Sequence, residues 1–171
     1  MAHRDTPFSV IGIDPGIATT GFAILKKDKD NITVLKYGTI ETTKGTHLGE
    51  RLKIIYLSIK NILEEYPIDF VAIEKIFFNT NLKTVVSVSE ARGIILLAAE
   101  EYGKKVYEYT PLEAKKNILG NGRATKQEIQ ISLKQILNLE KIPKPDDAAD
   151  AIAIALCHIY SYNYLVEAED D

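Results

Sequence analysis

The order of its apolar segments constrains the fold of this chain more than any other feature. Strand-like runs come first, at Phe8–Ile13, Gly21–Lys26 and Ile32–Ile40, with a hairpin turn at Asp28–Asn31 between the last two. A helical stripe, Leu48, Leu52, Ile55, Ile59 and Ile62, follows and ends before Pro67. Then come, in order, a strand (Phe70–Ile73), a helix (Thr80–Tyr102), a strand (Lys105–Tyr109) and helices at Pro111–Ile118, Thr125–Leu137 and Ala148–Ile159. This order predicts an α/β fold with a mixed five-stranded sheet flanked by helices.

Length and composition narrow the class of protein. The 171 residues fit one domain over 1–171, with residues 1–6 and 166–171 expected to be flexible ends. No apolar stretch reaches the roughly 18 residues of a membrane span, and the N-terminus lacks the apolar core of a signal peptide. The single cysteine, Cys157, can form neither an internal disulfide nor a CxxC metal site. We therefore expect a cytoplasmic protein without a disulfide or zinc scaffold.

Charge is distributed unevenly along the chain. The net charge of −3 argues mildly against a nucleic-acid-binding protein. Lys and Arg nevertheless outnumber acidic residues over 103–126, whereas Asp and Glu predominate over 140–171. The chain therefore has a basic patch that could bind nucleic acid, and its acidity lies elsewhere.

Four carboxylates adjoin apolar structure. Asp14 ends the first strand, Glu74 ends the fourth, and Asp150 lies among the alanines of the last helix. Asp147 precedes Asp150 by three residues, so both project from the same helix face. A carboxylate is costly to bury alone, but a group of them can hold divalent cations that promote phosphodiester hydrolysis.

Each of these residues also has a structural interpretation. Asp14 before Pro-Gly could be an ordinary turn residue. Glu74 could pair with Lys75 or Arg92. Asp146 or Asp147 could cap the last helix, and we expect Asp146 to do so. Of the histidines, His47 is expected in a surface loop or at a helix start, and His158 partly buried and too far from Asp150 to share a metal.

Three acidic motifs and two further segments resemble the RuvC-type Holliday junction resolvases. IGIDPGIATTGFAIL at 11–25 is similar to the opening strand and turn of the family. VAIEKIFFNTN at 71–81 is similar to its second acidic motif, and DDAADAIAIALCH at 146–158 to its C-terminal acidic helix. EARGIILLAA at 90–99 and VYEYTPLEAKKNILGNGRATKQEI at 106–129 also resemble family segments.

The resemblance implies a ribonuclease H-like fold and a homodimer that nicks four-way DNA junctions in recombination and repair. It implies two Mg²⁺ per subunit, replaceable by Mn²⁺, and a branch-migration complex of the RuvA–RuvB type as partner. The catalytic and metal-binding residues it implies are Asp14, Glu74, Asp147 and Asp150. The residues expected to contact DNA are Phe77, Lys115, Lys126, Arg123 and Arg92. Phe78 is an alternative to Phe77, and either could instead lie in the core or at the dimer interface. Unlike many family members, which end in a basic tail, this chain ends in Glu-Ala-Glu-Asp-Asp.

Other functions remain open at this point. Asp14-Pro15-Gly16 with Thr19-Thr20 is also typical of the phosphate loop of actin-like ATPases and sugar kinases, although a second glycine-rich loop is not found. A ribonuclease H acting on RNA–DNA hybrids would need only a monomer. A junction-binding module without catalysis is disfavoured because every acidic motif residue is present.

Overall fold

A computed structural model of the chain describes residues 6–76 and 82–169, with side chains as far as Tyr162. The strands are β1 (Phe8–Asp14), β2 (Thr19–Asp28), β3 (Asn31–Glu41), β4 (Phe70–Glu74) and β5 (Lys105–Tyr109). The helices are α1 (Leu48–Glu65), α2 (Leu82–Glu101), α3 (Pro111–Leu119), α4 (Lys126–Ile136) and α5 (Asp146–Glu169). Every predicted strand and helix is present, with small differences at the ends of most of them.

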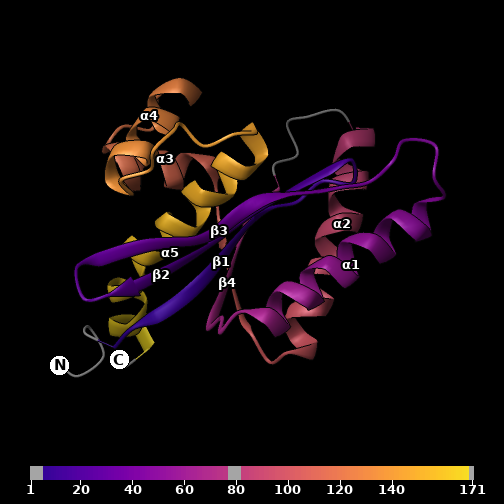
Figure 1. Cartoon of the computed structure of the whole chain (residues 1–171), viewed down its shortest axis with the longest axis horizontal. Coiled ribbons are helices and arrows are strands. Elements are labelled where there is room, and N and C mark those ends of the chain that lie inside the picture. Colours follow the sequence, from indigo (N-terminus) through magenta and orange to yellow (C-terminus); the bar gives the residue numbers. More distant parts are fainter. Residues whose placement is uncertain (1–5, 77–81, 170–171) are drawn as a thin grey trace.

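The five strands form one mixed sheet, as predicted. Their order is β3-β2-β1-β4-β5. β2 pairs antiparallel with both β1 and β3, which the hairpin connections require, whereas β4 is parallel to β1 and to β5. The helical crossovers α1 and α2 join the parallel strands (Figure 1). β1 is therefore the central strand of the sheet, with the antiparallel β2 on one side and the parallel β4 on the other.

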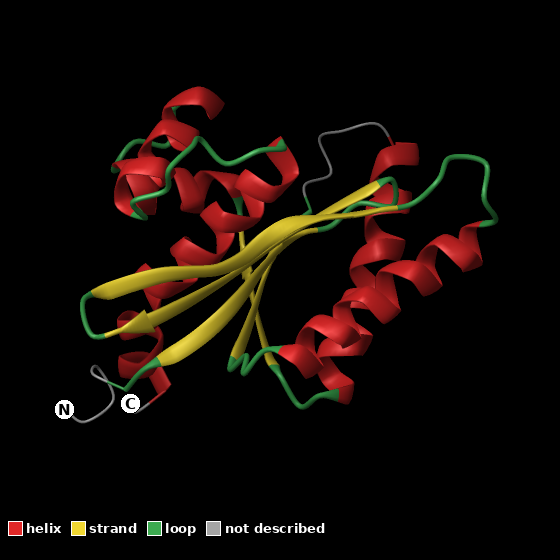
Figure 2. Cartoon of the chain, in the orientation of Figure 1, coloured by secondary structure: helices red, strands yellow, loops and turns green. Residues whose placement is uncertain are grey.

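Helices cover both faces of the sheet (Figure 2). Along β1, Val10 belongs to the core beneath α5, whereas Ile11 and Ile13 belong to the core beneath α1 and α2. This alternation follows from the two-residue period of a strand, and burial on both faces explains why β1 reads as a continuous apolar run. None of the helices in the described part of the chain combines the length and hydrophobicity needed to cross a membrane.

Helix α5 is longer than predicted. The expected end was Ile159, but the helix continues through Glu169. In the first of the added turns, the ring of Tyr162 lies 4.5 Å from that of Phe8 and 5.2 Å from that of Phe70, measured between ring centroids. The N-terminal strand thus gives the end of α5 an apolar surface to pack against, which periodicity within the helix alone does not reveal.

His158 lies at the centre of this aromatic group and is fully buried, more deeply than predicted. The rings that contact it are Phe8, Phe70, Tyr107, Tyr109 and Tyr162. Its Nδ1 lies 2.8 Å from the Tyr109 hydroxyl oxygen, and its Nε2 is buried without a hydrogen-bond partner among the described residues. Burial penalises the charged ring and lowers the pKa of His158 to about 4.

This buried histidine should make the fold less stable in acid. The pKa of His158 is lower in the folded state than the ordinary value of 6.5, so its contribution is complete above that value and is lost as the pH falls toward 4. We expect this to remove about 2–3 kcal/mol from the free energy of unfolding between about pH 7 and pH 4.5, measured by urea unfolding. His158→Phe should remove this part of the acid dependence. Parallel pH profiles for the two proteins would contradict the prediction.

Candidate active site

Two adjacent parallel strands end in carboxylates. Asp14 is the last residue of β1 and Glu74 is the last residue of β4. The strands pair with Ile13 opposite Ile73, so the residues that follow emerge side by side at one edge of the sheet. The two half-buried carboxyl groups are close enough to hydrogen-bond to each other. Asp14 is therefore more than a turn residue, and Glu74 does not form the alternative pairs with Lys75 or Arg92.

Helix α5 brings two more carboxylates to the same edge. Asp147 and Asp150 lie in its first turns, three residues apart and hence on one face. A glycine allows the close approach: a Cβ added to Gly21 would lie 2.0 Å from the carbonyl oxygen of Asp147. Gly21 pairs with Asp14 across β1 and β2, so this contact sets the start of α5 beside Asp14. The structure thus gathers all four predicted residues, Asp14, Glu74, Asp147 and Asp150, which we call the acidic cluster.

Burial and mutual repulsion make the ionised forms of the acidic cluster unfavourable. Burial, followed by the hydrogen bond and negative charge of Glu74 and by the charges of Asp150 and Asp147, raises the pKa of Asp14 to about 9. Burial is also the largest cause of the raised pKa values of Glu74 and Asp150. Burial and the neighbouring negative charges therefore favour the protonated form of Asp14 when no cation is nearby.

Lys126 supplies a positive charge at one side of the cluster. It is the first residue of α4, which Thr125 starts with a capping box, and its Nζ lies 3.0 Å from an oxygen of Asp150. The same Nζ lies 3.4 Å from Asp146. Asp146, expected to cap α5, is instead the first residue of that helix, and its carboxylate accepts a hydrogen bond from the buried Gln130, at 2.9 Å. Asp146 thus ties the start of α5 to α4.

The donor set of the acidic cluster fits a divalent cation. Four carboxylates offer hard oxygen ligands of the kind that Mg²⁺ and Mn²⁺ bind, and the raised pKa of Asp14 indicates that positive charge is favoured there. Among residues 6–76 and 82–169, no three His, Cys, Asp or Glu side chains converge as closely as the ligands of a bound ion. Like charges repel, and Asp150 contacts Lys126 instead. Binding an ion would require the carboxylates to turn toward it.

Three hollows lie along the acidic cluster, and each shares lining residues with the next; together we call them the groove. At one end lies a pocket of about 280 Å³ that we call the lysine pocket, lined by Glu74, Asp150, Lys115 and Lys126 among others. It adjoins a second hollow of about 280 Å³, lined by Asp14 and also by Glu74. Carboxylates of the cluster therefore form part of the wall of both hollows.

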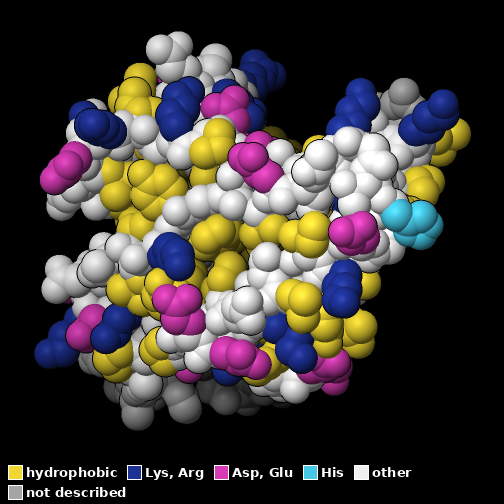
Figure 3. Space-filling model, turned by 45° about the vertical axis from the view of Figure 1, so that its right-hand side comes forward, with side chains coloured by type: hydrophobic (Ala, Val, Ile, Leu, Met, Phe, Trp, Pro, Cys, Tyr) yellow, Lys and Arg dark blue, Asp and Glu magenta, His cyan; other side chains and the backbone are white. Residues whose placement is uncertain are grey.

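The groove continues into a larger pocket at its other end, of about 940 Å³. This pocket shares Thr84 and Val88 with the second hollow, and Asp147 also lines it. Its basic residues are Lys44, Arg51 and Lys83. We call it the arginine pocket. Figure 3 shows Lys and Arg side chains at the upper left and upper right of the face, with acidic side chains between them.

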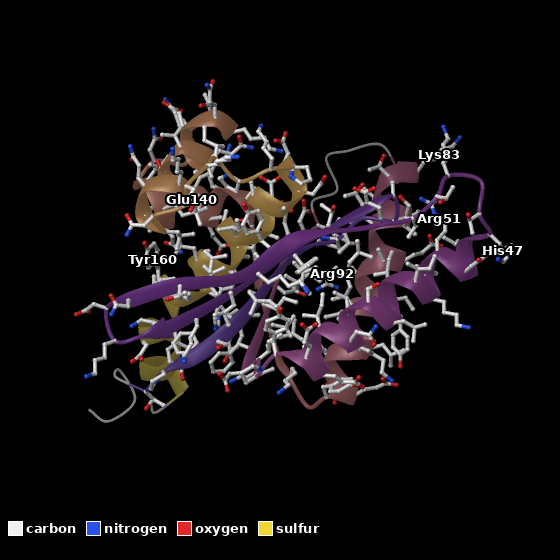
Figure 4. All side chains as sticks on the ribbon, viewed as in Figure 1. His47, Arg51, Lys83, Arg92, Glu140 and Tyr160 are labelled. Carbon is white, nitrogen blue, oxygen red and sulfur yellow. The ribbon has the colours of Figure 1, made fainter. Side chains whose placement is uncertain are left out.

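The residues predicted to contact DNA are placed differently from one another. Lys115 and Lys126 both line the lysine pocket. Arg123 is exposed in the loop before α4, where its backbone N–H donates to the side chain of Asn121. Arg92, labelled in Figure 4, lies on α2 and forms an ion pair with Glu108 of β5. Phe77 and Phe78 lie outside the described residues.

Two residues of the arginine pocket, Lys44 and Arg51, were not among the predicted site residues. Arg51 occupies an ordinary polar position of an amphipathic helix, and Lys44 lies in the loop before that helix. Nothing local distinguishes them from solvated cations. The only available clue was topological. If β3 lies at the edge of the sheet, the segment 42–51 that follows it must pass near the ends of β1 and β4.

Comparison with known sequences identifies relatives along most of the chain. Residues 10–158 match the profile of a family described as crossover junction endodeoxyribonuclease RuvC. A protein of that name from Alkaliphilus oremlandii is 47% identical over 155 residues, which are 91% of this chain and 94% of the relative. Its counterpart from Alkaliphilus metalliredigens is 48% identical over the same coverage.

Comparison with solved structures agrees. The fold is similar to that of Thermus thermophilus RuvC in complex with a Holliday junction substrate, with a TM-score of 0.87 and 32% sequence identity. The match covers 92% of this chain and 96% of the other. The same protein solved without mention of a substrate gives a TM-score of 0.86. The predicted ribonuclease H-like fold is therefore confirmed.

Proposed function

The chain belongs to the RuvC family of crossover junction endodeoxyribonucleases, and we propose that it resolves Holliday junctions in recombination and repair, with the acidic cluster as its catalytic centre. The observation that carries this proposal is that four carboxylates line adjoining hollows, with cations at both ends of the series. A DNA strand in this groove would place its backbone phosphates at the basic ends and one phosphodiester at the carboxylates. Neither end needs to recognise a base for this placement.

The catalytic roles follow from the positions of the side chains. Asp14, Glu74, Asp147 and Asp150 would hold Mg²⁺, with Mn²⁺ as a substitute and two ions per subunit. When bound, the ions would supply a nucleophile at neutral pH and stabilise the charge that develops on the phosphate. Lys126 neutralises Asp150 in the absence of DNA and lies within the same pocket as Lys115, where both can hold a phosphate.

One assay separates this proposal from its alternatives. The protein is incubated with Mg²⁺ and a labelled four-way junction, a linear duplex, an RNA–DNA hybrid or ATP. We expect nicks in the junction alone, at symmetrical positions in two strands. Cutting of the hybrid would identify a ribonuclease H, and release of phosphate from ATP would identify an ATPase. Binding of the junction without any cutting would leave a recognition module.

Paired cutting leads us to propose a homodimer. A four-way junction has two-fold symmetry, and a two-fold dimer presents two identical sites related by the same symmetry. Helix α2 supplies an apolar surface for this: Val85 and Ile95 are buried in the subunit, whereas Leu82 is 78% exposed, Val86 56% and Leu97 51%. Helix α2 is therefore apolar on more than one face. Self-association through these exposed side chains stays a proposal.

We expect light scattering to give the mass of a dimer at micromolar concentration and a cruciform plasmid to become linear. A linear product requires both nicks within the lifetime of one complex. Val86→Lys should shift the protein toward monomers and the product toward nicked circles, because a charge on the apolar face opposes association. A wild-type monomer, or nicked circles as its only product, would contradict the dimer. A branch-migration complex of the RuvA–RuvB type stays the predicted protein partner.

A further inference from the structure

The arginine pocket gathers basic side chains from separate parts of the chain. Lys44 comes from the loop between β3 and α1, Arg51 from the first turns of α1, and Lys83 from the start of α2. Figure 4 shows Arg51 and Lys83 at the same end of the molecule, where α1 and α2 begin. Asp147 also lines this pocket, so it opens directly onto the acidic cluster. A ligand in the pocket would therefore continue into the catalytic centre.

Arg51 is held in place by the loop that follows Asp14. Its Nε donates to the Thr42 hydroxyl oxygen at 2.7 Å, and that hydroxyl donates to the carbonyl oxygen of Ile17 at 2.5 Å. The backbone N–H of Thr42 also donates to the carbonyl oxygen of Ala18, at 3.0 Å. These bonds fix one side of the guanidinium and leave its terminal N–H groups as donors for a ligand.

Among the described residues, Arg51 forms no ion pair with a carboxylate, although it is half-buried. The other half-buried arginine among the described residues, Arg92, is paired with Glu108. A half-buried, uncompensated arginine with an anchored Nε is arranged to receive an anion from outside. The two oxygens of a phosphate match the forked donors of a guanidinium.

We propose that Arg51 and Lys44 form a second phosphate-binding site for the junction strand, on the opposite side of the acidic cluster from Lys115. The groove provides the path, since the arginine pocket, the second hollow and the lysine pocket share lining residues in that order. Phosphate contacts on both sides of the acidic cluster would hold the DNA strand across the carboxylates. Contacts at one basic end alone would leave the rest of the strand unfixed. The site rests on the proposed function, since it takes the same DNA strand that the acidic cluster cuts.

A second copy of the chain fits the arginine pocket less well. A two-fold interface places the same patch on both sides, so like charges from the two subunits would lie close together. Leu82 and Val86, which belong to the proposed dimer surface of α2, also line this pocket, and the oligomeric state of the variants is therefore part of the test.

The test measures binding to a synthetic four-way junction with Ca²⁺ in place of Mg²⁺. Arg51→Gln should weaken binding about five- to twentyfold and lower the slope of log affinity against log salt by about one unit, and Lys44→Gln should act in the same way. Arg51→Lys, which keeps the charge, should retain the salt slope. Lys53→Gln is the matched control, because Lys53 is exposed on the same helix and does not line the pocket.

The location of the site is tested with neutral methylphosphonates placed one at a time along the junction strand. Wild-type protein should lose affinity at positions on both sides of the cut. In Arg51→Gln, the methylphosphonates that cause no further loss of affinity should all lie on one side of the cut. In Lys115→Gln, they should lie on the other side. Positions on the same side would overturn the proposal.

Three further results would overturn the assignment of Arg51. The first is that Arg51→Gln binds the junction with unchanged affinity and salt slope. The second is that the substitution changes the particle mass on light scattering. The third is that the variant binds normally but does not cut when all of the junction is bound. Thermal melting within a few degrees of wild type would show that Arg51→Gln is folded. If wild-type protein does not prefer the junction to linear duplex, the proposed function itself fails, and this result is distinct from failure of the Arg51 variants alone.

Discussion

Asp14→Asn, Glu74→Gln and Asp150→Asn should each abolish cutting of a four-way junction while preserving its binding. Each substitution keeps the shape of the side chain but removes a charged oxygen ligand from the acidic cluster. Loss of a catalytic ion removes several kcal/mol of transition-state stabilisation, so we expect the cutting rate to fall by about a thousandfold or more. Junction binding should stay the same or tighten, because negative charge next to the DNA is removed.

Two measurements accompany the cutting assay. Addition of Mn²⁺ should raise the melting temperature of the wild-type protein and release protons, since the raised pKa of Asp14 favours a bound proton that the ion would displace. Both effects should be lost in Asp14→Asn. Asp30→Asn, in the exposed turn between β2 and β3, is the control and should behave like wild type. A variant of Asp14 or Asp150 that cuts at nearly the wild-type rate would rule out the acidic cluster as the catalytic centre.

Gly12→Ala and Gly21→Ala should be among the most destabilising substitutions in the chain. A Cβ on Gly12 would lie 2.2 Å from the carbonyl oxygen of Ala151, and one on Gly21 would lie 2.0 Å from that of Asp147. Both obstacles are backbone atoms of α5, so the whole helix must move. Overpacking a rigid core typically costs 1–3 kcal/mol, and we expect about 3 kcal/mol or more here. The melting temperature should fall by roughly 6–12 °C for a chain of this length.

The Gly21 variant should also lose cutting in the fraction that stays folded, because displacing Asp147 separates it from Asp14. The control is Gly49→Ala in the first turn of α1, where an added Cβ meets only the His47 ring, at 3.5 Å. That change should be neutral or slightly stabilising, since alanine favours a helix more than glycine does. Similar melting temperatures for all three variants would show that α5 tolerates displacement from the sheet.

Local sequence pattern was sufficient to predict the strands, the helices apart from the end of α5, and the four carboxylates as candidate site residues. Asp14 and Glu74 could be identified because each ends an apolar run, and parallel strands bring such ends together. Asp147 and Asp150 could be identified from their spacing on one helix. These features depend on backbone periodicity, which a short window of sequence contains.

Contacts between distant segments could not be predicted in the same way. The pairing of Arg92 with Glu108 depends on how α2 lies against β5. The contact of Asp146 with Gln130 depends on how α4 meets α5, and the anchoring of Arg51 depends on where β3 delivers Thr42. In each case tertiary packing determines which residues come into contact. Residue type alone would allow many other pairs along the chain.

The position of α5 in the chain has a consequence for protein synthesis. Asp14 is synthesised well before Asp147 and Asp150, which reach the strand ends only when α5 docks on Gly12 and Gly21. A nascent chain still on the ribosome, or a fragment left by premature termination before α5, therefore carries half of the carboxylates and no helix to complete them. If the acidic cluster is the catalytic centre, a chain that lacks α5 should therefore be unable to cut DNA.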